Sequence, residues 1–237
     1  MKRLFLATVV LFMIAGVTFW MLAKQQHPPA VVAAVVGSSP FDAIRSKAEA
    51  GDPKAQFTLG GMYETGSGVD EDRRAAFDWF MKAAEQGHGE ALGKVGWCYE
   101  TGFGVREDVY KAAKYYRLAA SFNNVADAQF HLGQLYFYGK GVPHDYGKAI
   151  EFYSLAAAQG HGGAQFILGS MYEEGWGVKQ DLIKAYAWVK MSLARKDQAL
   201  AVNRKYDPEK KLPKLMAKMN KFQIGEGEKL IRELGKR

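Results

Sequence analysis

Apolar residues recur at helical spacing along most of the chain, and this pattern predicts pairs of helices. In the first such unit Ala55, Leu59 and Tyr63 are spaced by four residues, which places them on one stripe of a helix. Gly60 lies on the neighbouring face, where the absence of a side chain lets a second helix approach closely. This stretch therefore predicts an amphipathic helix with a close helical partner.

Two glycines and an aspartate mark the boundary inside the unit. Gly66 and Gly68 predict a loop with positive φ, which glycine adopts at little cost. Asp72 then precedes the second helix, where its carboxylate accepts free backbone N–H groups and is favoured by the helix dipole. The second helix carries Phe80 on its apolar stripe and ends at Gly87. The unit is thus an antiparallel helix pair that cannot bury its apolar face alone.

This unit occurs four times, so the sequence predicts a solenoid. Its starting alanines, Ala55, Ala91, Ala128 and Ala164, are 36, 37 and 36 residues apart. Glycine, tyrosine, a G-x-G-V loop and an aspartate return at the same offsets in every copy. Stacking of such units buries their apolar faces and creates a concave and a convex surface. The predicted fold is an all-α solenoid with repeats at residues 55–90, 91–127, 128–163 and 164–197.

Both ends of the array are predicted to be caps. Phe41–Gly51 matches the second helix of a unit that lacks its first helix, so residues 41–54 are assigned to an N-terminal cap helix. Residues 198–237 are assigned to basic C-terminal capping helices. A helix is predicted at Lys184–Leu200, which begins in the fourth repeat, and a break follows at Asp207-Pro208. Two further helices are predicted at Leu212–Lys221 and Gly225–Leu234.

The repeating pattern is A-x-x-x-L-G-x-x-Y-x-x-G-x-G-V-x-x-D-x-x-K-A-x-x-W/Y-Y-x-x-A-A-x-x-G. It resembles the Sel-one-like repeat family, a relative of the tetratricopeptide repeats, over roughly residues 41–197. Val95 and Ala75 depart from the pattern, and the fourth unit loses its closing A-A-x-x-G, which argues against a fifth full repeat. The resemblance implies an α/α solenoid whose first helices line the concave face.

The N-terminal sequence predicts a membrane anchor. Leu4–Leu22 is uncharged and follows two basic residues, and 19 residues at about 1.5 Å each span roughly the 30 Å hydrocarbon core. We expect residues 4–23 to be an uncleaved signal anchor in the inner membrane, with residues 1–3 in the cytoplasm and the repeats in the periplasm. A cleaved signal peptide, which leaves a periplasmic or secreted protein, is the alternative. Residues 24–40 contain three prolines and are predicted to be a linker.

The charge is unevenly distributed along the 237 residues. The net charge is +7, but residues 179–237 carry 16 Lys+Arg against 7 Asp+Glu, so the preceding part is slightly acidic. A periplasmic location excludes nucleic acid and leaves anionic lipid headgroups or an acidic partner for this basic surface, unless it is only a solvated helix face. The lysines assigned to it are Lys205, Lys210, Lys211, Lys214, Lys218 and Lys221.

The sequence contains no recognisable catalytic, metal or cofactor site. The loop glycines lack the third glycine, the preceding strand and the lysine of phosphate-binding loops. The five histidines lack ligand spacing: His88 and His161 occupy one turn position, and His131 has no second ligand at helical spacing. Cys98 is the single cysteine and is predicted to be a buried or groove-lining apolar residue. Some cysteine-rich proteins of the resembled family have been credited with β-lactam hydrolysis, but their paired cysteines and a Ser-x-x-Lys motif are absent here.

The remaining candidates are the non-motif positions of the first helices, which line the predicted groove. Trp97, Tyr138 and Lys94 are the strongest of these, since aromatic and long basic residues dominate interface energetics, although Trp97 is also suited to filling a gap between units. The predicted partner-binding residues are Thr58, Lys94, Trp97, Thr101, His131, Gln134, Tyr138, Ser170 and Glu174. We therefore expect a non-enzymatic adaptor or scaffold for a protein partner. The alternatives are a periplasmic hydrolase of β-lactam or peptidoglycan-related substrates and a small-ligand or peptidoglycan-binding module.

Overall fold

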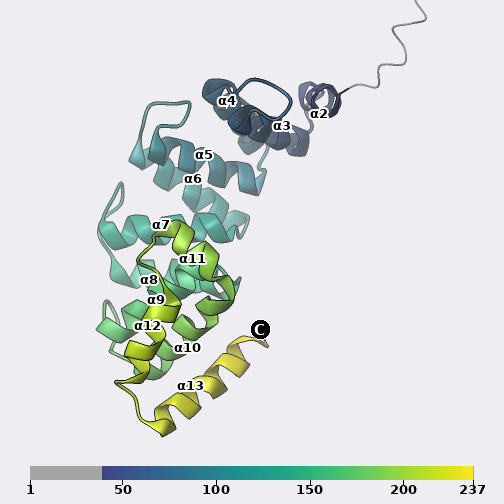
Figure 1. Cartoon of the computed structure of the whole chain (residues 1–237). Coiled ribbons are helices and arrows are strands. Elements are labelled where there is room, and N and C mark those ends of the chain that lie inside the picture. The colour runs from purple at the N-terminus through teal and green to yellow at the C-terminus, as the bar shows by residue number, and fades with distance from the viewer. Residues whose placement is uncertain (1–38, 237) are drawn as a thin grey trace, which may run out of the picture. The chain divides into compact units, whose positions relative to one another are not determined.

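The computed structural model describes residues 39–236 and shows a stack of helix pairs within that range (Figure 1). The four first helices are α3 (Pro53–Thr65), α5 (Gly89–Thr101), α7 (Ala126–Tyr138) and α9 (Gly162–Glu174). The four second helices are α4 (Arg73–Glu85), α6 (Val109–Phe122), α8 (Tyr146–Ala158) and α10 (Leu182–Ser192). Each first helix packs against the second helices before and after it, and no strand occurs in the described range. The predicted all-helical solenoid of four repeats is confirmed.

The predicted helix boundaries follow from local backbone chemistry. Asp72 is the N-cap of α4, and its side chain accepts the backbone N–H of Ala75. Asp108, Asp145 and Asp181 occupy the same position before α6, α8 and α10. Gly66 ends α3 in the left-handed region with φ of 69°, where a side chain is strained. These caps satisfy backbone groups that a helix end leaves without partners.

A glycine in each first helix permits close packing within the pair. A Cβ atom on Gly60 would lie 2.6 Å from the ring of Phe80, and one on Gly96 would lie 2.7 Å from the ring of Tyr116. Gly133 and Gly169 are equally crowded by the second helices of their own repeats. The side chains that take this space are nearly or fully buried and form much of the core. The predicted role of Gly60 is therefore confirmed.

Buried glutamines connect successive repeats. Gln56 Nε2 donates to the carbonyl oxygen of Ala48, and Gln165 Nε2 donates to that of Ala157. Both bonds join a first helix to the end of the helix before it, which is the N-terminal cap helix for Gln56 and α8 for Gln165. The signal in the sequence is the recurring Ala-Gln pair, whose polar glutamine is not part of an apolar stripe.

The N-terminal cap occupies the place of a preceding second helix. This cap, α2 (Pro40–Glu49), packs against α3, and Ser39 closes its N-terminus in a capping box with Asp42. Phe41 of α2 meets Gly68 of the first repeat loop, just as Phe77 meets Gly104 in the second. The apolar end of the first repeat is thereby covered.

The predicted continuous helix Lys184–Leu200 is wrong. α10 ends at Ser192, a 3₁₀ turn covers Leu193–Arg195, and α11 (Lys196–Val202) turns back onto α9. The bend places Gln198 Oε1 where it accepts the N–H of Gly162 at 2.8 Å, at the beginning of α9. Contact with α9, rather than a local helix breaker, therefore sets this end of α10.

The last two helices also differ from the prediction. Asp207-Pro208 begins α12 (Pro208–Met216) instead of breaking a helix, because Asp207 accepts two backbone N–H groups and proline at the first position needs no partner for a missing N–H. α13 (Lys221–Leu234) begins four residues earlier than expected, at a capping box between Asn220 and Gln223. Both helices pack against α10. They follow the fourth repeat where a fifth pair would stand.

Within residues 39–236 no helix has the length and apolar character needed to cross a membrane. The predicted cytoplasmic stub, signal anchor and nearly all of the linker lie outside the described residues.

Candidate binding groove

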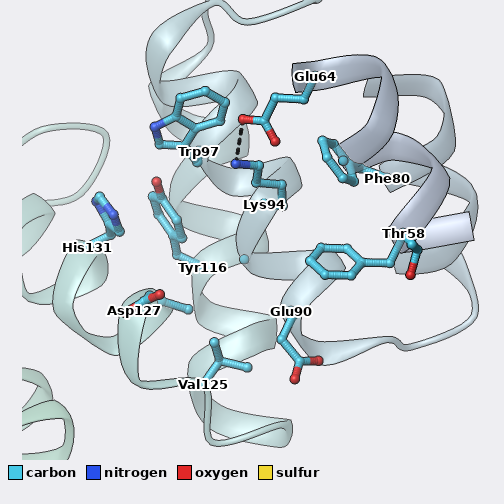
Figure 2. A pocket seen from close by; sticks show the side chains of 14 residues that line it. Thr58, Glu64, Phe80, Glu90, Lys94, Trp97, Tyr116, Val125, Asp127 and His131 are labelled. Atoms are coloured by element: carbon cyan, nitrogen blue, oxygen red, sulfur yellow. Dashed lines mark hydrogen bonds and ion pairs between the residues drawn. The ribbon is translucent and has the colours of Figure 1, made fainter. Parts of the chain in front are cut away.

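A cavity of about 590 Å³ lies between the first helices of the first three repeats (Figure 2). We call it the central cavity. Four of the residues predicted to bind a partner line it: Thr58, Lys94, Trp97 and His131. The other lining residues are Phe57, Gly61, Glu64, Phe80, Glu90, Gly93, Tyr116, Val125, Asp127 and Ala128.

The cavity exists because two repeat positions lack side chains. Gly93 of α5 stands where the other three first helices carry Phe57, Phe130 and Phe166. Gly61 of α3 stands where the second repeat has a tryptophan, and a Cβ atom there would meet nothing within 4 Å. The space these glycines leave lies on the groove side of α3 and α5. This signal is present in the alignment of the repeats, but no glycine is among the predicted partner-binding residues.

Lys94 crosses one wall of the cavity and is already paired. Its Nζ atom lies 2.7 Å from Glu64 Oε1 and 4.3 Å from the centroid of the Trp97 ring (Figure 2). Such a cation–π contact contributes about 0.5–2 kcal/mol, depending on how far the pair is desolvated. Trp97 also packs against Phe103, with ring centroids 5.0 Å apart. The indole therefore has fixed neighbours on α5 and the following loop, while one part of it borders the cavity.

His131 belongs to a hydrogen-bonded cluster at the opposite wall. Its ring stacks on Tyr116 with centroids 5.0 Å apart, and its Nδ1 lies 3.3 Å from Glu100 Oε2. The same carboxylate oxygen accepts the hydroxyl of Tyr116 at 2.6 Å. Although burial opposes ionisation of Glu100, the close contact with His131 and the hydrogen bond from Tyr116 lower its pKa below the ordinary value. The wall therefore contains an anionic carboxylate behind an aromatic surface.

Two further carboxylates stand at the rim of the cavity, and we call Glu90 and Asp127 the rim carboxylates. Both are the second residues of their helices, and their side chains are 68% and 76% exposed. Each lies 3.4 Å from a histidine nitrogen, of His88 and His161 respectively. Burial lowers the pKa of His161, so this ring is neutral near pH 7. Neither rim carboxylate has a lysine or arginine partner among residues 39–236.

The groove face of α9 is covered by the chain itself. Tyr206 stacks on Phe166 with ring centroids 5.1 Å apart, and α11 lies along the same helix (Figure 1). Phe166 and Ile167 are consequently buried. We call residues 196–211, which include this segment and the start of α12, the C-terminal strap. The predicted groove is therefore open at the central cavity and closed at the fourth repeat.

The remaining predicted groove residues lie outside the central cavity. Gln134 and Tyr138 line a smaller cavity of about 150 Å³ together with Glu100 and Lys140. The hydroxyls of Thr101 and Ser170 donate to carbonyl oxygens of their own helices. Glu174 is exposed at the end of α9. The structure thus brings together four of the nine predicted residues in one site.

The predicted basic surface is partly used to attach the C-terminal helices. Lys211 and Lys218 contact the two oxygens of Glu173, a buried carboxylate of α9, at 2.5 and 2.8 Å. Although burial opposes ionisation of Glu173, these two lysines lower its pKa. Lys210 pairs with Asp207. The lysines of the surface without a carboxylate partner in the described range are Lys205, Lys214 and Lys221.

Among residues 39–236 the cysteine and the potential metal ligands have no special arrangement. Cys98 is buried, and burial raises the pKa of its thiol to about 12. No cluster of His, Cys, Asp and Glu side chains within residues 39–236 has the geometry of a metal site. His88 and His161 instead cap α5 and α9 by accepting the N–H groups of Ala91 and Ala164. Both histidines therefore have structural roles at the beginning of first helices.

Comparison with known proteins agrees with this architecture. A family model of the Sel1 repeat matches residues 53–88, 89–121, 126–161 and 163–197. No curated protein matches the chain. A protective antigen of uropathogenic Escherichia coli with an SLR fold is 36% identical, with a TM-score of 0.63 over 65% of this chain and 33% of that one. A Sel1 repeat protein from Oxalobacter formigenes is also 36% identical, with a TM-score of 0.58 over 62% of this chain and 58% of that one. The chain therefore spans about a third of the first and somewhat more than half of the second.

Proposed function

The chain belongs to the Sel1 repeat family, whose members generally mediate protein–protein interactions, and we propose that it is a non-catalytic adaptor that binds a protein partner in the central cavity. The observation that carries the proposal is the cavity itself. It is open, it is lined by aromatic rings from consecutive repeats, and all of its lining residues except Phe80, Tyr116 and Ala128 lie at positions that the repeat pattern leaves free to vary. Positions fixed by the pattern are used for caps and packing, so they are not available to specify a partner.

The proposed location is the bacterial inner membrane, with the repeats on the periplasmic side. The support is the uncharged run Leu4–Leu22 behind two basic residues, which is long enough to span the bilayer and oriented by the positive-inside rule. An adaptor attached in this way would collect its partner close to the membrane surface.

Trp97 is expected to be the main contact residue. It is the largest side chain at the cavity, and its ring is fixed by Lys94 and Phe103, so little conformational entropy is lost on binding. Truncation of a central aromatic residue at an interface commonly costs about 2 kcal/mol or more, which corresponds to roughly a thirtyfold loss of affinity.

The test is capture of the partner from cross-linked envelope by tagged full-length protein and by two variants. Trp97→Ala removes the cavity aromatic. Phe122→Ala removes an aromatic that is 81% exposed on α6 and serves as the matched control. A partner that is retained by Phe122→Ala and lost from Trp97→Ala supports the proposal, provided that far-UV circular dichroism shows equal helicity. Equal recovery by all three proteins refutes the groove assignment.

A small-ligand-binding module is the second candidate, because the volume of the central cavity lies within the range of ligand sites. Partner capture distinguishes the two functions. A small-ligand module yields no partner that depends on Trp97.

A further inference from the structure

The two helix rows carry opposite charge. The four first helices contain two lysines against six carboxylates, a net charge of −4. The four second helices contain nine lysines and arginines against three carboxylates, a net charge of +6. The row of first helices is therefore acidic, although the whole chain is basic. A bound segment of positive charge would be attracted to the first helices and one of negative charge would be repelled.

The acidic character is concentrated where the groove is open. Glu64 is neutralised by Lys94, but the rim carboxylates Glu90 and Asp127 have only histidine neighbours. Figure 2 shows both carboxylates at one side of the cavity, below the aromatic rings of Phe80 and Tyr116. Their common position in the first turn of a helix is favoured by the helix dipole, and both side chains are largely exposed to solvent.

The closed part of the groove shows what kind of segment fits on a first helix. The C-terminal strap places Tyr206 on Phe166, and its Lys211 contacts Glu173 and lies 5.7 Å from the Phe166 ring centroid. Phe57 and Glu64 of α3 occupy the repeat positions of Phe166 and Glu173 in α9. The strap therefore combines an aromatic ring with a nearby lysine, on a surface equivalent to one wall of the central cavity.

From these three observations we propose that the central cavity binds a basic segment of the partner protein, in which an aromatic or large aliphatic side chain is flanked by lysine or arginine. The apolar side chain enters the cavity between Phe57 and Trp97. The flanking cations lie at Glu90 and Asp127. This inference rests on the proposed function, because it specifies the segment that the same cavity recognises.

The proposal is tested by fluorescence anisotropy with full-length protein in mild detergent and three labelled peptides of equal length. The first carries a central phenylalanine between lysines, the second has glutamates in place of the lysines, and the third has alanine in place of the phenylalanine. We expect the first peptide to bind at least tenfold more tightly than either of the others. Its affinity should also fall as salt is raised, because the rim carboxylates are exposed.

Charge variants identify the site of binding. The double variant Glu90→Lys with Asp127→Lys should weaken binding of the basic peptide at least tenfold, and Glu90→Gln with Asp127→Asn should give a smaller loss in the same direction. Asp197→Lys is the matched control, because Asp197 is likewise the exposed second residue of a helix, α11, and does not line the cavity.

Each outcome decides between the two proposals. Equal binding of the basic and acidic peptides, or an unchanged affinity in both double variants, overturns the inference about charge. If a partner is still captured in a Trp97-dependent way, the proposed function remains. If neither the peptides nor a captured partner respond to the cavity variants, both proposals fail.

Discussion

Alanine substitutions at two glycines of α5 are predicted to have opposite effects on stability. Gly93 borders the central cavity, and a Cβ atom there would lie 3.7 Å from Ala128 Cβ, an ordinary van der Waals distance. Gly96 lies one helical turn further along, and a Cβ atom there would lie 2.7 and 2.9 Å from two carbons of the Tyr116 ring. The two substitutions are identical in chemistry, so only the surroundings differ.

The expected magnitudes follow from this contrast. Alanine in place of glycine inside a helix contributes about 0.5–1 kcal/mol of stability, and at Gly93 nothing opposes this gain. At Gly96 the added methyl overlaps Tyr116, and overpacking costs about 1–3 kcal/mol. The ring cannot move aside, because its hydroxyl bonds to Glu100 and its face stacks on His131. We therefore expect Gly93→Ala to raise the free energy of unfolding by about 0.5–1 kcal/mol and Gly96→Ala to lower it by about 1–2 kcal/mol.

Thermal unfolding followed by far-UV circular dichroism measures both effects on the full-length protein. At about 2–4 °C per kcal/mol for a domain of this size, Tm should rise by a few degrees in Gly93→Ala and fall by several degrees in Gly96→Ala. A shift of the same sign in both variants would refute the interpretation of the cavity as empty space. Gly93→Phe extends the test, because it inserts the side chain found at this position in the other repeats. It should abolish partner capture without lowering Tm.

Three further predictions concern the histidine cap, the buried glutamate and the strap. His161→Ala should lower stability near pH 7.5 by about 0.5–2 kcal/mol through loss of the cap on α9, and an unchanged Tm would contradict that role. Because burial lowers the pKa of His161, its contribution to the stability of the fold is present above the ordinary histidine value of 6.5 and is lost as pH falls through the lowered pKa. The difference in Tm between His161→Ala and the parent protein should therefore shrink below pH 6.5. The pKa of Glu173 is also lowered, so its ion pairs stabilise the fold above the ordinary value of 4.5 and are lost as pH falls through the lowered pKa. Acid titration of Glu173→Gln should therefore show a smaller loss of stability in this range than the parent protein. An identical acid transition in both proteins would count against the role of these ion pairs. Tyr206→Ala should uncover Phe166 and increase binding of an apolar fluorescent dye, and no increase would show that α11 covers the face without it.

Much of the fold could be predicted because its determinants are local. Asp72 caps α4 through a backbone N–H three residues away, and Gly66 ends α3 through its own φ angle. Such signals recur in every repeat, so an error at one copy is corrected by the other three. Asp207-Pro208 shows the limit of this reasoning, since the same dipeptide is suited both to interrupting a helix and to starting one, and only the helix that follows distinguishes the two.

The rest depends on contacts between residues far apart in the sequence. After α10 ends at Ser192, the chain turns back so that Gln198 of α11 meets Gly162, 36 residues earlier, and nothing within Lys184–Leu200 itself predicts that contact. The cover on α9 likewise depends on Tyr206 meeting Phe166. For the site, Lys94 and Trp97 could be selected by type and position, but the pairing of Lys94 with Glu64 requires two repeats to be in register. The cavity could have been predicted from Gly61 and Gly93, because a groove position without a side chain leaves space in the same way that a large side chain fills it.

The strap also sets the length of what the protein can bind. With the fourth repeat closed, the open surface extends across three first helices. A surface this short accommodates only a few residues of extended chain, which rises about 3.3 Å per residue. A partner would therefore present a short linear motif to this groove rather than a folded surface, and the same motif transplanted onto an unrelated carrier protein should retain most of its affinity.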